Sequence, residues 1–231
     1  LGERGLRHKI TLAREIPVEA YLGVLGGTGF TAWFGVEDIG QPKPGETMVV
    51  SAAAGAVGSI AGQLGKLRGA RVIGIAGSEE KCAWLVDACG FDGAINYRRD
   101  ELGPALDRLC PKGIDVDFEN VGGDTLDAVL QRANVGARVA LCGLIAGYNG
   151  EGPDVGPRPF RAVMMKRLRV QGFIVLDYAR RFGEARAALE ALVADGKLVH
   201  RSHVVEGLER APDALAGLFT GENRGKTVVR V

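Results

Sequence analysis

Apolar and polar residues alternate along this chain in two different periods. Short apolar runs predict strands over Met48–Ala52, Arg71–Ala76, Ala94–Asn96, Asp115–Glu119, Arg138–Cys142, Val170–Val175 and Thr227–Val231. Apolar residues at helical spacing predict helices over Val57–Arg68, Glu79–Cys89, Glu101–Leu109, Asp124–Ala133, Phe182–Asp195 and Leu208–Thr220. Strands that alternate with helices at this pitch predict an α/β fold, a doubly wound parallel sheet with helices on both faces.

Two stretches do not follow this alternation. Within the first 46 residues, His8–Ile16 has the pattern of a short extended segment, and Val18–Val36 that of a helix broken at a Gly-Gly pair. Residues 143–159 are rich in Gly and Pro and are too long for a tight connection. A connection of this length indicates a functional loop.

The composition narrows the class of protein. With 231 residues, 46% of them apolar and 25% charged, the chain can bury a core of its own. A formal net charge of +1 gives no electrostatic basis for binding nucleic acid or an anionic membrane. There is no apolar run of transmembrane length, and the four scattered cysteines include no C-x-x-C pair. We therefore expect reduced thiols in a cytoplasmic protein.

A turn of small residues follows the first predicted strand. Residues 49–58 read V-V-S-A-A-A-G-A-V-G and lead directly into a helix. The spacing is A-x-G-x-x-G, with Ala53 where the dinucleotide fingerprint has its first glycine and with Gly55 and Gly58 at the other two places. Glycines here let backbone N–H groups approach a pyrophosphate at a helix N-terminus. The pattern predicts a dinucleotide ligand and a sheet of the Rossmann type.

The tip of the second strand selects the cofactor in such a sheet. An Asp or Glu there binds the ribose 2′-hydroxyl of NAD, whereas a cation accommodates the 2′-phosphate of NADP. Gly77 and Ser78 occupy the tip, about twenty residues beyond the glycine turn, and Lys81 lies one helical turn further on. The tip itself therefore carries no carboxylate.

Residues after the third strand bear on the same choice. Tyr97 and Arg98 follow that strand and are placed to flank a 2′-phosphate. Glu79 and Glu80 put negative charge nearby and weaken the case. On balance, the pattern favours NADP over NAD.

Other catalytic motifs are missing or fail in detail. Residues 220–227, T-G-E-N-R-G-K-T, look like a phosphate-binding loop, but three residues separate Gly221 from Gly225 where that motif needs four. The sequence contains no G-x-S-x-G elbow and no H-E-x-x-H pair. His200 and His203, like the cysteines, belong to no grouping that could supply zinc ligands, so we expect no metal.

Seven stretches occur in an order typical of one known family. They are G-G-T-G-F-T-A-W-F-G (26–35), V-V-S-A-A-A-G-A-V-G-S (49–59), G-S-E-E-K (77–81), F-E-N-V-G-G (118–123), L-C-G-L-I-A-G-Y-N (141–149), G-F-I-V (172–175) and G-E-N-R-G-K-T (221–227). Together they resemble the zinc-independent medium-chain dehydrogenase/reductases, specifically the prostaglandin reductase and alkenal (enone) reductase subfamily. The resemblance covers nearly the whole chain.

This resemblance implies a reaction and a set of site residues. The reaction is NADPH-dependent reduction of the carbon–carbon double bond of an α,β-unsaturated ketone or aldehyde, with hydride transfer to the β-carbon. The implied cofactor-binding residues are Gly55, Ala56, Val57 and Gly58 at the pyrophosphate, Lys81 and Tyr97 at the 2′-phosphate, Asn120 near the ribose and nicotinamide, Cys142, Gly143, Tyr148, Phe173, Ile174 and Val175 around the nicotinamide, and Asn223 closing the site. Charge develops on the carbonyl oxygen as an enolate, and Tyr148 or a cofactor ribose hydroxyl would donate a hydrogen bond to it. Tyr148 is therefore the candidate catalytic residue.

The resemblance also divides the chain into three parts. Residues 1–24 are similar to the tail and linker of a barrel-like amino-terminal catalytic domain, residues 25–203 to the dinucleotide-binding domain, and residues 204–231 to the segment that returns to the catalytic domain. At most the tail of the barrel is represented here. We therefore expect a truncated or partial chain, or a homodimer that covers the exposed apolar face.

Other functions stay open at this point. A quinone reductase of the same superfamily would differ in its preference for quinones over enones. A non-catalytic NADPH-binding protein would bind the cofactor without transferring hydride. A methyltransferase also uses a glycine-rich first turn, but an acidic residue usually stands at the tip of its second strand, where this chain has Gly77. The expected partner is a small-molecule enone, alkenal or quinone.

Overall fold

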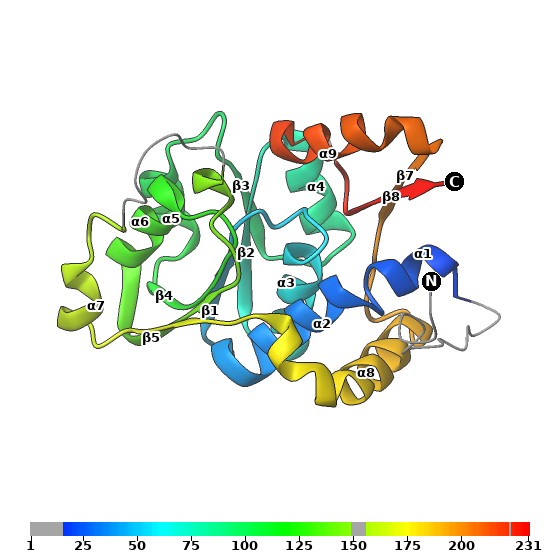
Figure 1. Cartoon of the computed structure of the whole chain (residues 1–231). Helices are drawn as coiled ribbons and strands as arrows, with labels where there is room; N and C mark the ends of the chain where they lie inside the picture. Colours follow the sequence, from blue (N-terminus) through cyan, green and yellow to red (C-terminus); the bar gives the residue numbers. More distant parts are fainter. Residues whose placement is uncertain (1–15, 149–155, 222) are drawn as a thin grey trace.

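Six parallel strands form the central sheet of the protein. The computed structural model describes residues 16–148, 156–221 and 223–231, so most of the segment expected to be extended, 8–16, lies outside the described residues. The strands are β1 (Thr47–Val50), β2 (Arg71–Ala76), β3 (Gly93–Asn96), β4 (Ile114–Glu119), β5 (Ala133–Leu141) and β6 (Arg169–Gly172). Their order in the sheet is β3-β2-β1-β4-β5-β6, and every pair is parallel (Figure 1). This is the doubly wound arrangement of the Rossmann fold, as predicted.

Helices cover both faces of this sheet (Figure 1). Their bounds are α1 (Val18–Leu22), α2 (Gly27–Phe34), α3 (Gly58–Leu67), α4 (Glu79–Asp87), α5 (Leu102–Leu109), α6 (Gly123–Arg132), α7 (Arg161–Met165), α8 (Phe182–Ala194) and α9 (Ala211–Thr220). One apolar cluster joins the sheet to α2, α3, α4 and α8, and a second joins it to α5 and α6. None of the described helices is long and apolar enough to cross a membrane.

Close approach of α3 to the sheet depends on two glycines. Ile60, Ala61 and Leu64 bury the apolar face of this helix. A Cβ atom on Gly62 would overlap the ring of Phe91, and one on Gly65 would lie 2.5 Å from the Met48 sulfur atom. The helix therefore sits against β1 and the chain after α4 at a distance that only glycine permits at these positions.

The amino-terminal helix is broken where the sequence predicts it. The chain leaves α1 at Gly23, turns, and enters α2 at Gly27. A Cβ atom on Gly26 would collide with the carbonyl oxygen of Tyr21, so this turn needs glycine. A π-helical turn, Gly35–Gly40, then follows without a break, and the expected helix end at Val36 falls inside it. Gly35 lies against the rings of Phe118 and Phe173, which explains why no side chain is tolerated there.

The last part of the chain forms a separate parallel pair. Strand β7 (Ser202–Glu206) pairs in parallel with β8 (Lys226–Arg230), and α9 connects them. The sequence predicted α9 and β8 but not β7. The two consecutive valines of β7, Val204 and Val205, interrupt the alternation of apolar and polar residues that marks a strand.

Several element boundaries differ from the predicted ones. Strand β5 begins at Ala133 rather than Arg138, so it includes Ala133, which the sequence placed at the end of the preceding helix, and residues 134–137, which it placed in no element. Strand β6 ends at Gly172, and a 3-10 turn, Val175–Arg181, replaces the expected end of that strand. Phe173 turns away from the sheet edge to pack against Phe118 and Tyr178, with ring centroids 6.5 and 6.4 Å apart. Tertiary packing thus overrides the apolar run that predicted a longer strand.

Replacing Gly62 by Ala should lower the free energy of unfolding by about 1–3 kcal/mol, the range for overpacking a tight core. The added methyl group would overlap the buried ring of Phe91. Gly183 in α8 is the matched control, because nothing lies within 4 Å of its Cβ position. Gly183→Ala should leave stability unchanged or raise it by less than about 1 kcal/mol. Urea unfolding measures both, and equal midpoints for Gly62→Ala and the unaltered protein would contradict the packing described.

Candidate functional site

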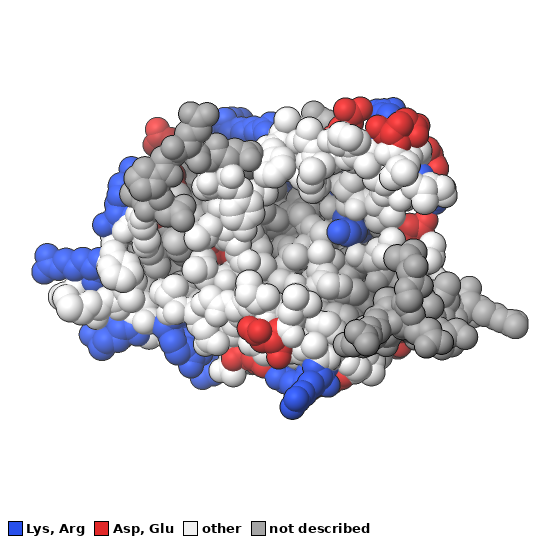
Figure 2. All heavy atoms as spheres, in the orientation of Figure 1, with Lys and Arg blue, Asp and Glu red and all other residues white. Residues whose placement is uncertain are grey.

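A cavity of about 740 Å³ lies at the carboxyl ends of the central strands. Segments that follow β1, β2, β3 and β4 line it together with the end of α9 and the chain that leads into β8. Strands β1 and β4 are neighbours in the sheet, and the connections run outward in opposite directions from them. Ligands of doubly wound sheets bind at such a reversal, so the topology alone marks this cavity as the candidate site. Over most of its middle, the face in Figure 2 is uncharged, and charged side chains lie mainly around its edge.

The glycine turn forms one wall of the cavity. Gly55, Ala56, Val57 and Gly58 all line it, and their binding of a pyrophosphate stays a prediction. The N–H of Gly55 donates to the carbonyl of Ala52 at 2.9 Å, which closes the turn. Helix α3 begins at Gly58, and the N–H groups of Ser59 and Ala61 already donate to the carbonyls of Gly55 and Val57, so the groups left for a ligand are those of Ala56, Val57 and Gly58. The positive end of the helix dipole therefore faces the cavity beside these groups, an arrangement suited to an anion.

A Cβ atom on Gly58 would lie 2.6 Å from the carbonyl oxygen of Ala52. The turn and the first residue of the helix are therefore in direct backbone contact. Any larger residue at this position would push the N-terminus of α3 away from the turn.

Two cations meet at the far end of the cavity. Lys81 Nζ donates to the carbonyl of Gly221 at 2.7 Å, and Arg98 Nη2 donates to the carbonyl of Thr220 at 2.8 Å. Both acceptors lie at the C-terminal end of α9, where the helix dipole is negative. Burial and the charges of Arg98 and Arg224 lower the pKa of Lys81. Carbonyl groups carry no net charge, so the two cations keep their positive charge at this end of the cavity.

The two glutamates beside Lys81 are occupied by other partners. Glu79 accepts a hydrogen bond from Asn96 at 2.7 Å and pairs with Arg99 at 3.0 Å. Glu80 pairs with Arg224 at 2.8 Å. These contacts weaken the objection that the sequence raised against an anion site at this end of the cavity, although the charge of Glu80 still opposes the lowering of the Lys81 pKa.

The tip of β2 lies beneath an aromatic ring. A Cβ atom on Gly77 would lie 3.1 to 3.4 Å from the ring and hydroxyl of Tyr97, and the Arg98 guanidinium lies 5.9 Å from the centroid of that ring. Ser78 caps α4 by accepting a hydrogen bond from the backbone of Lys81 at 3.3 Å. This cap orients the first turn of α4 so that Lys81 reaches the cavity.

Asn120 lines the cavity at the end of β4 and is held rigidly by the end of β1. Its backbone N–H donates to Ser51 Oγ, and its side-chain Nδ2 donates to the Ser51 carbonyl, each at 2.7 Å. Ser51 Oγ in turn donates to Glu119 at 2.7 Å. The side chain of Asn120 thus serves the geometry of the site, because its amide group is fixed by a hydrogen bond to the backbone of β1's end.

The carboxy-terminal segment borders the cavity next to the glycine turn. The N–H of Gly225 donates to the Ala54 carbonyl at 3.2 Å, and Gly55 and Gly225 form an isolated parallel bridge. Asn223 lines the cavity, as the resemblance implied, and its side chain donates to the Gly225 carbonyl at 3.3 Å. The segment is therefore attached to the same turn that begins the site.

Six of the predicted residues do not line the cavity. Cys142 and Gly143 lie beside it, where their N–H groups donate to the Glu119 carbonyl at 2.9 and 3.1 Å. The predicted residues concerned are Cys142, Gly143, Tyr148, Phe173, Ile174 and Val175. Phe173 and Val175 pack against the apolar core on the α2 side, whereas Ile174 is exposed. For Phe173, Ile174 and Val175 the physical reason is that β6 ends at Gly172, so the chain leaves the sheet before these residues. Cys142 and Gly143 follow β5 and are held by the Glu119 carbonyl instead.

Tyr148 is exposed, and its hydroxyl points back toward its own loop. The backbone N–H of Leu144 donates to the Tyr148 hydroxyl at 3.4 Å, a long hydrogen bond that leaves the hydroxyl proton available to donate. Beyond Tyr148, residues 149–155 lie outside the described residues.

Sequence reasoning missed part of the lining. The missed residues include several near the ends of α6 and α9 or at the start of β8: Thr125, Leu218, Phe219, Lys226 and Thr227. Leu218 and Phe219 are half-exposed apolar residues at the end of α9, a signal that could have marked a ligand-facing helix end. Thr125 carried no comparable signal, since a buried threonine at a helix start has no distinctive spacing.

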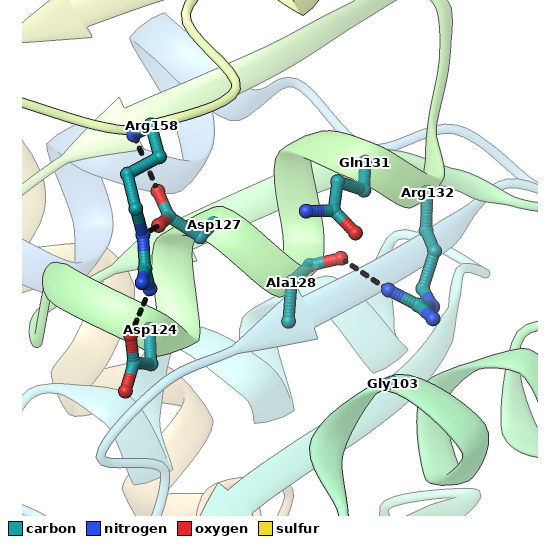
Figure 3. Close-up of a pocket in the computed structure, with 7 residues that line it drawn as sticks. All are labelled: Gly103, Asp124, Asp127, Ala128, Gln131, Arg132 and Arg158. Atoms are coloured by element: carbon teal, nitrogen blue, oxygen red, sulfur yellow. Dashed lines mark hydrogen bonds and ion pairs between the residues drawn. The ribbon is translucent and has the colours of Figure 1, made fainter.

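A second hollow of about 490 Å³ lies between α5 and α6 (Figure 3). Arg158 pairs there with Asp124 and with Asp127, and Arg132 donates to the Ala128 carbonyl and pairs with Asp107 at 2.8 Å. Both arginines in this hollow are already neutralised by aspartates. It therefore offers no unpaired charge to a ligand.

The sheet order and the cavity at its reversal define a dinucleotide-binding domain of the Rossmann class. Residues 56–194 match the family described as zinc-binding dehydrogenase, and the chain belongs to this family, within the zinc-independent prostaglandin and alkenal reductase subfamily of the medium-chain dehydrogenase/reductases. The described residues include no group of three or more His, Cys, Asp or Glu side chains that could hold a metal ion.

Known relatives cover nearly the whole chain. The chain is 50% identical to a putative NADP-dependent oxidoreductase, YfmJ, of Bacillus subtilis over 93% of its length and 64% of that protein. It is 44% identical to the NADP(+)-dependent 2-alkenal reductase of Nicotiana tabacum, over 94% of its length and 64% of that protein. The crystal structure of CurA from Vibrio vulnificus in complex with NADPH superposes with a TM-score of 0.89 at 49% identity, covering 95% of this chain and 67% of that one. The chain thus spans about two thirds of the length of these relatives.

Burial protects the cysteines of this domain. It raises the thiol pKa of Cys82 and Cys110 to about 11 and that of Cys89 and Cys142 to about 12. Since the thiolate is the reactive form, labelling of the native protein with an aromatic disulfide at about pH 8 should be at least ~100-fold slower than labelling in urea. The rate should rise with pH. A thiol that reacts in the native protein as fast as in urea would contradict the burial of that cysteine.

Proposed function

We propose that this domain binds NADPH and that the protein reduces the carbon–carbon double bond of α,β-unsaturated ketones or aldehydes. The cofactor assignment rests on one observation. Lys81 and Arg98 lie together at one end of the cavity, and the N-terminus of α3 lies at the other. One anion site at each end of the cavity matches a pyrophosphate and a separate 2′-phosphate. A dinucleotide without that extra phosphate would give Lys81 and Arg98 no anionic partner, and they would bond only to the carbonyl groups of Gly221 and Thr220.

The residues present fit this cofactor. Ala56, Val57 and Gly58 would hold the pyrophosphate through backbone N–H groups at the start of α3. Lys81, Arg98 and Tyr97 would hold the 2′-phosphate. This anion would offset both the burial and the repulsion from Arg98 and Arg224 that lower the pKa of Lys81. Gly77 leaves room at the tip of β2 and contributes no negative charge there.

The relatives support both the cofactor and the reaction. A protein 50% identical to this chain is named an NADP-dependent oxidoreductase, and one 44% identical is named a 2-alkenal reductase. The matching structure from Vibrio vulnificus contains NADPH. These proteins are longer than the chain described here, so their activity is proposed for the protein that carries this domain.

The reaction needs a hydride donor and a hydrogen-bond donor for the substrate. When bound, the reduced nicotinamide supplies a hydride to the β-carbon of the substrate. Negative charge then develops on the substrate carbonyl oxygen, and a donor must stabilise it. We assign this role to the Tyr148 hydroxyl, whose proton is available, with a cofactor ribose hydroxyl as the other candidate. A hydride transfer of this kind requires neither a metal nor a protein nucleophile.

We also propose the division of labour along the chain. Residues 25–203 bind the cofactor, and residues 1–24 and 204–231 join this domain to the part of the protein that completes the substrate pocket. The parallel pair of β7 and β8 and the attachment of Gly225 to the glycine turn support a connecting role for the last segment.

Replacing Lys81 by Ala should weaken NADPH binding by roughly 1–3 kcal/mol and leave NADH binding nearly unchanged, since only NADPH carries the phosphate that this charge would contact. Fluorescence titration with both cofactors measures the effect. Lys66→Ala is the matched control, because Lys66 pairs with Asp92 on the surface and lies outside the cavity. It should change neither affinity. Equal losses for NADPH and NADH in Lys81→Ala would refute the phosphate assignment.

Replacing Tyr148 by Phe should lower the turnover of an enone by about 100-fold or more, the range for removing one oxyanion donor, with NADPH affinity retained. Stopped-flow oxidation of NADPH by the protein that carries this domain measures the step. Tyr97→Phe serves as a control, because it should affect NADPH affinity rather than the rate at saturation. Unchanged turnover in Tyr148→Phe would transfer the donor role to the cofactor ribose.

A further inference from the structure

Two carboxyl groups are buried side by side under the floor of the cavity. Asp117 and Glu119 are 1% and 0% exposed, and they lie on the same side of β4 because they are two residues apart on a strand. The neighbours of Asp117 in register are Val49 on β1 and Val139 on β5. Asp117 therefore lies in the apolar layer between the sheet and helices α5 and α6.

One oxygen of Glu119, Oε1, accepts all the hydrogen bonds that the described residues donate to these two carboxyl groups. Glu119 Oε1 accepts hydrogen bonds from Ser51 Oγ at 2.7 Å, from the N–H of Gly122 at 2.8 Å and from the N–H of Val121. Within the described residues, Glu119 Oε2 and both oxygens of Asp117 receive no hydrogen bond from any donor. The two side chains are neighbours on one face of β4, and the Glu119 carboxyl raises the pKa of Asp117 through its charge and through a hydrogen bond between the two groups. As two carboxylates, the pair would leave three buried acceptors unsatisfied.

Elementary electrostatics decides where a proton must reside. Two adjacent carboxylates in a medium of low dielectric cannot both stay ionised. Burial and the charge of Glu119 raise the pKa of Asp117 well above its ordinary value. Burial also raises the pKa of Glu119, but the donors on Oε1 oppose that rise. The charge is therefore best placed on Glu119 and the proton on Asp117.

We propose that Asp117 and Glu119 share a single proton at neutral pH, with protonated Asp117 donating to Glu119 Oε2, and that this pair is a positioning device for the turn Asn120–Gly122 in the wall of the cavity. The proton satisfies Oε2, so Oε1 is fixed toward Ser51 and the two N–H groups of the turn. That orientation sets the turn in place between β4 and α6. The effect on cofactor binding rests on the proposed function; the shared proton does not.

Infrared spectroscopy tests the proton directly. The folded protein should show the carbonyl band of a protonated carboxylic acid at neutral pH, and the band should vanish in urea at the same pH. Asp117→Asn should abolish it, because the amide keeps the donor but carries no titratable proton. Asp127→Asn is the matched control, since Asp127 is also buried but pairs with Arg158. It should leave the band intact. A folded protein without this band would overturn the proposal, even if Asp117→Asn does not fold.

The pH dependence of unfolding gives a second test. A group whose pKa is raised in the folded state holds a proton that the unfolded chain releases, so stability falls as the pH rises. From about pH 5.5 to about pH 7.5, the unfolding constant of the unaltered protein should rise about tenfold more per pH unit than that of Asp117→Asn. Cys142 also faces Glu119, but its pKa of about 12 keeps it protonated throughout this range. Parallel pH profiles for the two proteins would refute the shared proton.

Cofactor titration tests the positioning role. Asp117→Asn should keep NADPH affinity within about threefold of the unaltered protein, because the amide still donates to Glu119, whereas Asp117→Val should lower it at least ~10-fold. Equal affinities in the two variants would overturn the positioning role. If the unaltered protein binds no NADPH, the proposed function fails, while the infrared band and the unfolding profile still decide on the proton.

Discussion

The adjacency of β1 and β4 is the constraint on which the rest of this structure depends. The two strands run parallel as neighbours, yet the chain leaves them toward opposite halves of the sheet and opposite faces. No connecting segment can cover their carboxyl ends, because each is drawn outward to its own helix. A cavity must open there, bordered by the start of α3 on one side and the turn before α6 on the other.

Distant parts of the chain complete this cavity and supply its charge. Lys81 and Gly221 are 140 residues apart in sequence, yet the side chain of the first bonds to the carbonyl of the second. Gly225 is bound to the glycine turn by a backbone bridge. The end of α9 thus holds two cations in position at low energetic cost, because a helix C-terminus already favours positive charge. The same contacts attach the last segment of the chain to the cofactor wall.

Beneath the site, the buried side chains of Ser51 and Glu119 fix the turn that begins at Asn120. Ser51 and Glu119 bind the backbone of the turn that Asn120 begins, so two neighbouring strands determine its position together. Gly122 has a φ of 77°, a backbone conformation that glycine adopts far more readily than other residues. Rigid support below the wall and charge at its two ends are what a preorganised cofactor site requires.

By itself, the sequence determined the alternation of strands and helices, the glycine turn after β1 and the lack of a carboxylate at Gly77. These features depend on residues close together in the chain, where periodicity and backbone sterics act directly. The tertiary structure alone decided that Arg98 joins Lys81 at the end of α9 and that Phe173 packs into the core rather than the cavity. It also decided that Asp117 is buried beside Glu119 where no donor among the described residues reaches it. Such facts depend on sheet register and on contacts between distant segments, and no local pattern of residues encodes them.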